Sequence, residues 1–438
     1  MKAGDVRIQH ARLLVALLAL AASFAILWLS RGFNFYFDEW TFILSAPDWT
    51  WTTYLEPHNE HPVILPRLIY AALLSTVGMR SYLPYMAVLL ALHAASAWLL
   101  FELVRRRAGD LLGVAAAALL LVLGAGWENL LWAFQMTFVG AAALGLGSLL
   151  AMETRRMGLA AALLAGAIMF SGIGLFFGVA VAVRLALTPQ RRKDLLWLAP
   201  VGVAFAAWYL AFGRAGLPPN PPPTAANIAL LPAYVGWGLG SAVAGIIGEG
   251  GWVGLVLMVA ALIAVARAWR RQGMDPFALG VAAGLLALYV ITGLTRAQLG
   301  YQQSGSGRYV YEGAIFLLLL LADAARDLPW RGTWRPASVA CVFLACFSSA
   351  ALLFTFATAK AVQMQRENAD LQALAAARGY SCLNPSGVAD PLVMPQVANP
   401  ALYYRAVDRY GSPLASTQIT NPDDFERAVQ NLTLSNCP

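Results

Sequence analysis

Long apolar stretches separated by short polar segments form the dominant pattern of this chain. Several of them approach the roughly 20 residues that an α-helix needs to cross a bilayer. They span residues 13–29, 82–104, 195–212, 252–266, 277–294 and 339–357. Because a segment inside lipid must satisfy its backbone hydrogen bonds internally, each stretch predicts a helix. The pattern therefore predicts an all-α polytopic membrane protein.

Composition agrees with this prediction. Of the 438 residues, 59% are hydrophobic and 12% are charged, against about 45–50% and about 25% in soluble domains. The first apolar stretch follows Lys2, Arg7 and Arg12, as in a signal peptide, but no small-residue cleavage site follows it before Arg31. We therefore expect it to stay in the protein as an uncleaved anchor.

The basic residues punctuate the apolar stretches. They cluster at residues 105–107, 155–156, 191–193, 267–271 and 326–335, which is the distribution of cytoplasmic loops. The net charge of +7 thus reports topology and does not predict nucleic-acid binding. Placing every cluster on the side of the N-terminus gives about 11 transmembrane helices in the plasma (inner) membrane, with a cytoplasmic N-terminus and an extracytoplasmic C-terminus.

In this topology, the number of spans is ambiguous for two segments. Residues 158–187 are too long for one helix and too short for two full ones, so we expect two short helices broken at residues 171–174. Residues 230–247 are Gly-rich and weakly apolar. Counting them as a span would move the cluster at 267–271 to the other side, so we expect an interfacial helix.

The chain divides by composition into residues 1–358, which hold the spans, and residues 359–438, a small polar extracytoplasmic tail domain. A disulfide between Cys382 and Cys437 suits this tail, which is too small to bury a large core; the alternative is two unpaired thiols. Cys341 and Cys346 lie in an apolar stretch, where free buried cysteines are common.

Two acidic residues come only a few residues after the first span. Asp38 and Glu39 lie among aromatic residues that favour the membrane interface, and interfacial helices are expected in the same outer loop. A carboxylate in this position could act as a general base or ligate a divalent cation. The alternative is that the pair is simply solvated at a helix end.

His58, Glu60 and His61 follow in the same loop. Their spacing matches no standard zinc pattern, and we expect them to position a polar substrate or a phosphate beside Asp38. The next apolar stretch, residues 63–79, predicts an amphipathic helix in the interface. Arg67 interrupts it and is expected to face water or a phosphate.

Arg308 and Tyr309 open a late span at the outer surface, and Arg296 precedes them. An arginine at that depth needs a partner, and guanidinium matches phosphate oxygens in a fork geometry. A lipid phosphate would satisfy it, although an arginine that snorkels at a helix end is the alternative.

The third outer turn also carries polar side chains at helix-like spacing. Polar groups at this depth face a cavity or another helix, and the sequence favours neither. These residues are Glu128, Asn129, Trp132 and Gln135.

Three short motifs, in this order, resemble the membrane-embedded C-type glycosyltransferases, in particular the protein O-mannosyltransferase and aminoarabinose transferase branch. They are the acidic pair Asp38-Glu39, the element His61-Pro62-Val63 and the late pair Arg308-Tyr309. Together they cover the order of elements over roughly residues 1–325. The family has a second proline where this chain has Val63, which leaves the geometry of that loop and the role of His61 open.

The resemblance implies that residues 1–358 form a glycosyltransferase-like domain that moves a sugar from a polyprenyl-phosphate carrier to an acceptor at the outer face. Asp38, with Glu39 beside it, would serve as the base, and Arg308 with Arg296 would hold the donor phosphate. The implied partners are a lipid-linked sugar donor and membrane lipid. The sugar, the acceptor and the cofactors stay open.

Other functions fit the same pattern. A transporter or flippase would also have many spans and a broken helix, although its charges should lie near the midplane of the bilayer. A non-catalytic assembly subunit would tolerate Asp38→Asn, and a polymerase or ligase that uses a lipid diphosphate would share the architecture.

Overall fold

The computed structural model describes residues 3–216, 221–327, 333–414, 419 and 421–434. This part of the chain is folded into α-helices and short 3-10 turns, and it contains no β-strand. The helices are α1 (Ala3–Leu29), α2 (Asp38–Ser45), α3 (Ile64–Thr76), α4 (Leu83–Ala108), α5 (Asp110–Leu121), α6 (Glu128–Leu131), α7 (Met136–Glu153), α8 (Met157–Phe170), α9 (Gly174–Ala186), α10 (Ala199–Ala211), α11 (Ala226–Ile246), α12 (Trp252–Gln272), α13 (Pro276–Arg296), α14 (Gly307–Ala324), α15 (Trp334–Ala377), α16 (Pro400–Tyr410) and α17 (Pro422–Leu432).

Length and composition make this an all-helical membrane protein. In the described ranges, 8 helical segments are long and apolar enough to cross a membrane, and α3, α5, α8 and α9 are shorter apolar helices. The number of 11 spans therefore stays a prediction. The 8 segments are Gln9–Leu29, Leu83–Ala108, Ala133–Glu153, Pro189–Ala211, Ala226–Ile246, Trp252–Gln272, Pro276–Leu299 and Trp334–Ala377.

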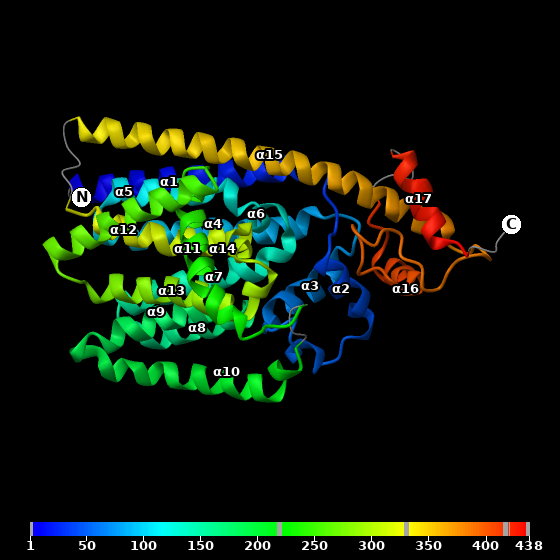
Figure 1. Ribbon diagram of the computed structural model, residues 1–438, viewed down its shortest axis with the longest axis horizontal. Helices are drawn as coiled ribbons and strands as arrows, with labels where there is room; N and C mark the ends of the chain where they lie inside the picture. Colours follow the sequence, from blue (N-terminus) through cyan, green and yellow to red (C-terminus); the bar gives the residue numbers. More distant parts are fainter. Residues whose placement is uncertain (1–2, 217–220, 328–332, 415–418, 420, 435–438) are drawn as a thin grey trace.

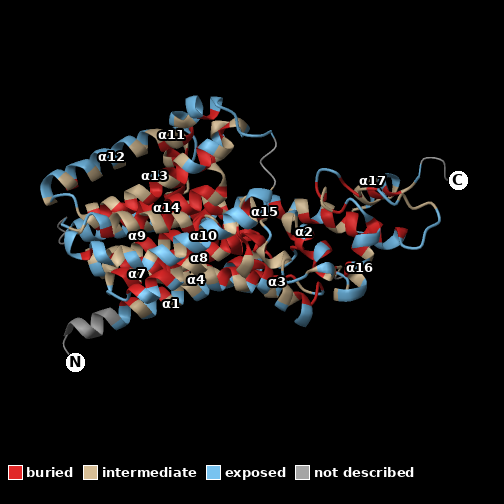
Figure 2. Cartoon of the chain, turned by 90° about the horizontal axis from the view of Figure 1, so that it is seen from below, coloured by how far each residue is buried: buried red, intermediate tan, exposed pale blue. Residues whose placement is uncertain are grey.

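The helices form a bundle with a buried centre and apolar outer faces. Most of α7 and α14 is buried, whereas α10 and α12 are mostly exposed (Figure 2). Large apolar side chains on the peripheral helices, such as Phe24, Val203 and Phe343, are more than two-thirds exposed. A water-soluble protein would not leave such faces uncovered, so these faces suit lipid.

One of the two ambiguous segments has the expected form. Helix α8 ends at Phe170 and α9 begins at Gly174, which confirms the predicted break. Although α11 is long enough to span, it runs across the long helices (Figure 1). Asn227 at its start donates to the carbonyl of Leu294 near the end of α13, and Trp237 in its middle packs on Trp252 at the start of α12. Helix α11 therefore does not run parallel to the long helices of the bundle.

Ion pairs join the helices at the end of the bundle opposite the tail. Arg107 at the end of α4 contacts Asp275 before α13 and Asp323 near the end of α14. Arg184 of α9 pairs with Glu153 of α7 at 3.2 Å. Partly buried charges remain stable there because each has a partner of opposite sign.

The tail lies at the other end of the molecule from the start of α1 (Figure 1). Helix α15 runs along one side of the bundle and continues into the tail as one helix of 44 residues (Figure 1). We call the end of the bundle that carries residues 359–438 the tail end. Cys382 is disulfide-bonded, whereas Cys341 and Cys346 are free. The expected partner Cys437 lies outside the described residues, so this pairing stays a prediction.

Candidate functional site

The first loop after α1 turns sharply before its acidic pair. Phe37 has φ +48, and α2 begins at the next residue, Asp38. Consecutive helical residues point about 100° apart, so the two carboxylates face different surroundings. Asp38 lies against a polar cavity, whereas Glu39 points into the protein core.

Glu39 is fully buried and holds the loop together. Its carboxylate accepts hydrogen bonds from the Tyr70 hydroxyl (2.7 Å), the Tyr82 hydroxyl (3.1 Å) and the Tyr36 backbone N–H (2.8 Å). Burial raises the pKa of Glu39 to about 7 despite these donors. The expected partner of Asp38 in catalysis therefore does not line the cavity, and its contacts are those of a positioning residue.

The two histidines close a tight turn. The backbones of His58 and His61 exchange hydrogen bonds of 3.0 Å, and Asn59 between them has φ +53. The turn places His58 Nε2 3.6 Å from Asp38 Oδ1. Burial and the nearby Arg296 lower the pKa of His61 to about 3, so its ring is neutral at physiological pH.

The break between α8 and α9 makes room for this turn. A Cβ atom on Gly172 would lie 2.8 Å from His61 Nδ1, which is too close for a larger residue. Glycine at this position therefore lets the chain pass beside the imidazole ring.

Both expected phosphate-binding arginines pair with a carboxylate. Arg308 Nε lies 2.9 Å from Glu128 Oε2, and Arg296 Nη2 lies 2.6 Å from Glu60 Oε2. Each pair links segments far apart in sequence, and each arginine still lines the polar cavity. Glu60 reaches the site only through Arg296.

Most of the expected site residues surround one cavity of about 50 Å³ at the tail end. At about 10–15 Å³ for each water, this space suits a few waters or a group the size of a phosphate. The predicted residues in its lining are Asp38, His58, His61, Arg296, Arg308 and Tyr309, and the other lining residues are Asn59, Val63, Phe134, Gln135, Thr137, Phe138 and Ser171.

Some polar side chains of this lining have buried atoms without a hydrogen-bond partner in the described structure, among them Gln135 and Thr137. Gln135 and Thr137 are buried, and neither Gln135 Oε1 nor Thr137 Oγ1 makes a hydrogen bond. A buried polar atom without a partner is costly, and a polar ligand in the cavity would satisfy it. The sequence leaves open whether Gln135 faces a cavity or another helix, and the structure places it in the cavity lining. Thr137 has no signal in the sequence beyond its position two residues after Gln135.

The expected role of Arg67 is wrong. Its side chain is buried and donates to the backbone carbonyls of Thr53 and Glu56, with its guanidinium 5.3 Å from the centre of the Phe42 ring. Arginine has several donors in a fixed fork, so one side chain can hold two carbonyls. Arg67 thus fastens the first loop to α3 and faces neither water nor the cavity.

An apolar groove of about 230 Å³ adjoins the polar cavity. Pro62 and Ile64 line the groove, while their neighbours His61 and Val63 line the polar cavity. The rest of the groove lies between α8 and the exposed helix α10, with Ile168, Met169, Val201, Phe205 and Trp208 among its residues.

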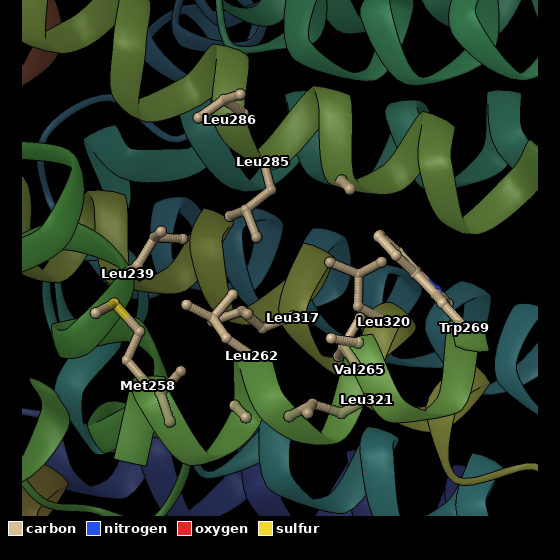
Figure 3. A pocket seen from close by; sticks show the side chains of 14 residues that line it. Leu239, Met258, Leu262, Val265, Trp269, Leu285, Leu286, Leu317, Leu320 and Leu321 are labelled. Atoms are coloured by element: carbon tan, nitrogen blue, oxygen red, sulfur yellow. The ribbon is translucent and has the colours of Figure 1, made fainter. Parts of the chain in front are cut away.

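A second apolar cavity, of about 370 Å³, lies between α11, α12, α13 and α14 (Figure 3). The side chains that line it are leucines and other apolar residues such as Met258 and Trp269. It offers no acid, base or charged group for chemistry. Its size alone therefore does not make it a reactive site.

The described residues hold no group of three or more His, Cys, Asp or Glu side chains arranged to bind a metal ion. Comparison of the chain with known proteins finds no matching family model, no matching curated protein and no matching solved structure.

Proposed function

We propose that this protein is a glycosyltransferase that moves a sugar from a polyprenyl-phosphate carrier to an acceptor at the outer face of the membrane. The observation that carries the proposal is one small cavity lined by the accessible carboxylate of Asp38, two arginines and a neutral imidazole, beside an apolar groove. Such a combination suits a substrate with a charged head and a hydrocarbon tail. This proposal takes the tail end as the outer face.

In the proposed reaction, the acceptor hydroxyl attacks C1 of the sugar and the bond from C1 to the phosphate oxygen breaks. Asp38 takes the hydroxyl proton, and the electron pair of the broken bond stays on the lipid phosphate. Asp38 suits the role because its carboxylate is accessible to the cavity, whereas Glu39 is buried among tyrosines.

Arg308 and Arg296 would hold the phosphate and stabilise the charge that grows on it as it leaves. Each now faces a carboxylate, so the phosphate would share or replace Glu128 and Glu60 as the partner. Neutral His61 adds a hydrogen-bonding group without a second charge. The groove beside Pro62 would take the first isoprene units, because it is apolar and lies beside the exposed helix α10.

The test is sugar transfer in membrane vesicles that contain the full chain. The vesicles receive polyprenyl-phosphate sugars that carry a label in the sugar. The measurement follows the label from the carrier into products that no longer contain the carrier. Asp38→Asn should lower the rate about 100-fold or more. Arg308→Ala should lower it by about 100- to 1000-fold because the leaving phosphate loses its cation.

Matched controls separate this outcome from loss of folding. Asp423 is an exposed acid of the tail, and Arg214 is an exposed arginine after α10. Asp423→Asn and Arg214→Ala should keep the wild-type rate. Wild-type activity in Asp38→Asn would overturn the proposal, and so would movement of intact labelled lipid across the vesicle membrane without sugar transfer, as a flippase predicts.

A further inference from the structure

A further cavity, with aromatic and polar groups in its lining, lies beside the proposed donor site. It has a volume of about 480 Å³ and is lined by residues of α11, α14 and α15 and by the turn before α6. Glu128 lines this cavity, while its ion-pair partner Arg308 lines the first one. The Arg308–Glu128 pair therefore forms the boundary between the two spaces.

Aromatic rings form much of the wall of this second cavity. Trp127 and Phe356 are half-buried and stack on each other with ring centres 5.1 Å apart. Trp237 lies in the same lining and is held by edge contacts with Trp252 and Tyr301. These contacts fix the indole planes, so the rings can serve as preformed faces for a ligand.

The polar groups of the lining are carboxylates and hydroxyls. Glu128 and the exposed Glu249 provide acceptors, and Ser306 has a buried hydroxyl without a partner in the described structure. The sequence Gly305-Ser306-Gly307 keeps the wall thin, because a Cβ atom on Gly305 would lie 2.9 Å from Trp237 Nε1. Gly305 therefore packs directly against the edge of the Trp237 ring.

The chemistry of this wall selects among ligand classes. A hydrocarbon chain would not use the carboxylates or the serine hydroxyl, and an anion would be repelled by Glu128 and Glu249. A sugar ring has an apolar face of C–H groups and hydroxyls at its edge. Fixed aromatic faces next to acceptor oxygens match that combination.

We propose that this cavity binds a carbohydrate, so that the acceptor of the transfer reaction is a sugar hydroxyl. This inference rests on the proposed function and names the class of its second substrate. The acceptor would stack on Trp237 and Trp127 and reach past Glu128 towards Asp38. Glu128 contacts the arginine of the donor site and also lines the acceptor site, so it can align the two substrates.

The experiment measures glycan binding to the detergent-solubilised full chain without any donor. The probes are immobilised oligosaccharides of defined sequence, with serine- and threonine-containing peptides on the same surface. Wild type should bind one class of oligosaccharide and no peptide. Trp237→Leu should weaken this binding by about fivefold to tenfold, because it removes the stacking face.

A second variant protects the test against misfolding. Glu249 is exposed, so Glu249→Gln should fold normally and still weaken glycan binding through loss of a charged acceptor. Trp334→Phe changes an exposed tryptophan at the opposite end of α15 and should bind like wild type. Equal glycan binding by wild type, Trp237→Leu and Glu249→Gln would overturn the inference, and so would selective peptide binding.

The two proposals fail in distinguishable ways. Glycan binding that depends on Trp237, combined with no sugar transfer in vesicles, would support the carbohydrate site and contradict the transferase. Sugar transfer to peptides or lipids that is unchanged in Trp237→Leu would support the transferase and contradict the carbohydrate acceptor.

Discussion

Two adjacent residues of the first loop have different roles, because consecutive positions of a helix face different directions. The sequence predicts Asp38 and Glu39 as one acidic pair, since both follow the first span. Only Asp38 reaches the cavity, while Glu39 binds the hydroxyls of Tyr70 and Tyr82. No sequence pattern reveals this difference, because it depends on which way α2 faces after the turn at Phe37.

Glu39 should make stability depend on pH. Burial raises its pKa from 4.5 to about 7, so the folded protein binds this proton more tightly than the unfolded chain. The resulting stabilisation, about 3 kcal/mol, is complete below the unfolded pKa and is lost as the pH rises towards the folded pKa. In thermal unfolding, the Tm of wild type relative to Glu39→Gln should therefore fall between about pH 5 and about pH 8.

The comparison with Glu39→Gln isolates this proton. His61 has a depressed pKa and acts in the opposite direction, with stability that is lost as the pH falls below its unfolded pKa. Both proteins contain His61, so its contribution cancels in the difference. A Tm difference that does not change with pH would show that Glu39 is ionised in the fold at every pH tested.

Arg67 should be needed for the shape of the first loop and not for charge in the site. Its guanidinium donates to the carbonyls of Thr53 and Glu56 and lies near the Phe42 ring, and a lysine has no planar guanidinium to make the same set of contacts. Arg67→Lys should therefore cost about 1–3 kcal/mol of stability while leaving the affinity of the solubilised protein for polyprenyl phosphate within about twofold. Loss of that affinity with unchanged thermal unfolding would instead place Arg67 in the binding site.

At the scale of elements, the sequence predicts the break between α8 and α9 because the apolar stretch has the wrong length for one helix or two. It also indicates that residues 230–247 differ from the other spans. It does not predict the close crossing of α11 over α12, where a Cβ atom on Gly254 would lie 2.3 Å from the carbonyl oxygen of Gly240. Such crossings depend on which glycines meet in space, and a single sequence does not contain that information.

This crossing gives a paired prediction for two glycines. Gly254→Ala should destabilise the protein, because its methyl group would push α12 away from α11. Gly236→Ala lies in α11 with nothing within 4 Å of the added methyl group, so it should be neutral or stabilising by up to about 1 kcal/mol. Thermal unfolding of the two variants in the same detergent checks both, and equal effects would contradict a tight crossing.

At the scale of the whole molecule, the tail packs on the loop that carries Asp38. The indole N–H of Trp40 donates to Glu367 at 2.7 Å, Arg405 pairs with Asp48, and the Met79 N–H donates to the Tyr410 carbonyl at 2.9 Å. The abrupt change of composition predicts a separate tail. The docking contacts have no sequence signal, because each joins residues more than 300 positions apart.

Charge exchange should test this docking. Arg405→Glu places like charges opposite each other, so the amides of α16 should exchange with solvent faster in hydrogen-exchange measurements. Adding Asp48→Arg restores opposite charges and should return the exchange rates to those of wild type. Because both side chains are exposed, the coupling should be small, about 0.2–1 kcal/mol. No recovery in the double variant would show that other contacts carry the docking.

Helix α15 continues without interruption from the bundle into the tail, and its 44 residues give it a length of about 66 Å. The hydrocarbon core of a bilayer is only about 30 Å thick. A single rigid rod therefore sets both the height of the tail above the membrane and its angle about the rod axis. One residue inserted into α15 would turn everything beyond it by about 100°. The number of residues in α15 therefore determines the position and orientation of the tail relative to the membrane.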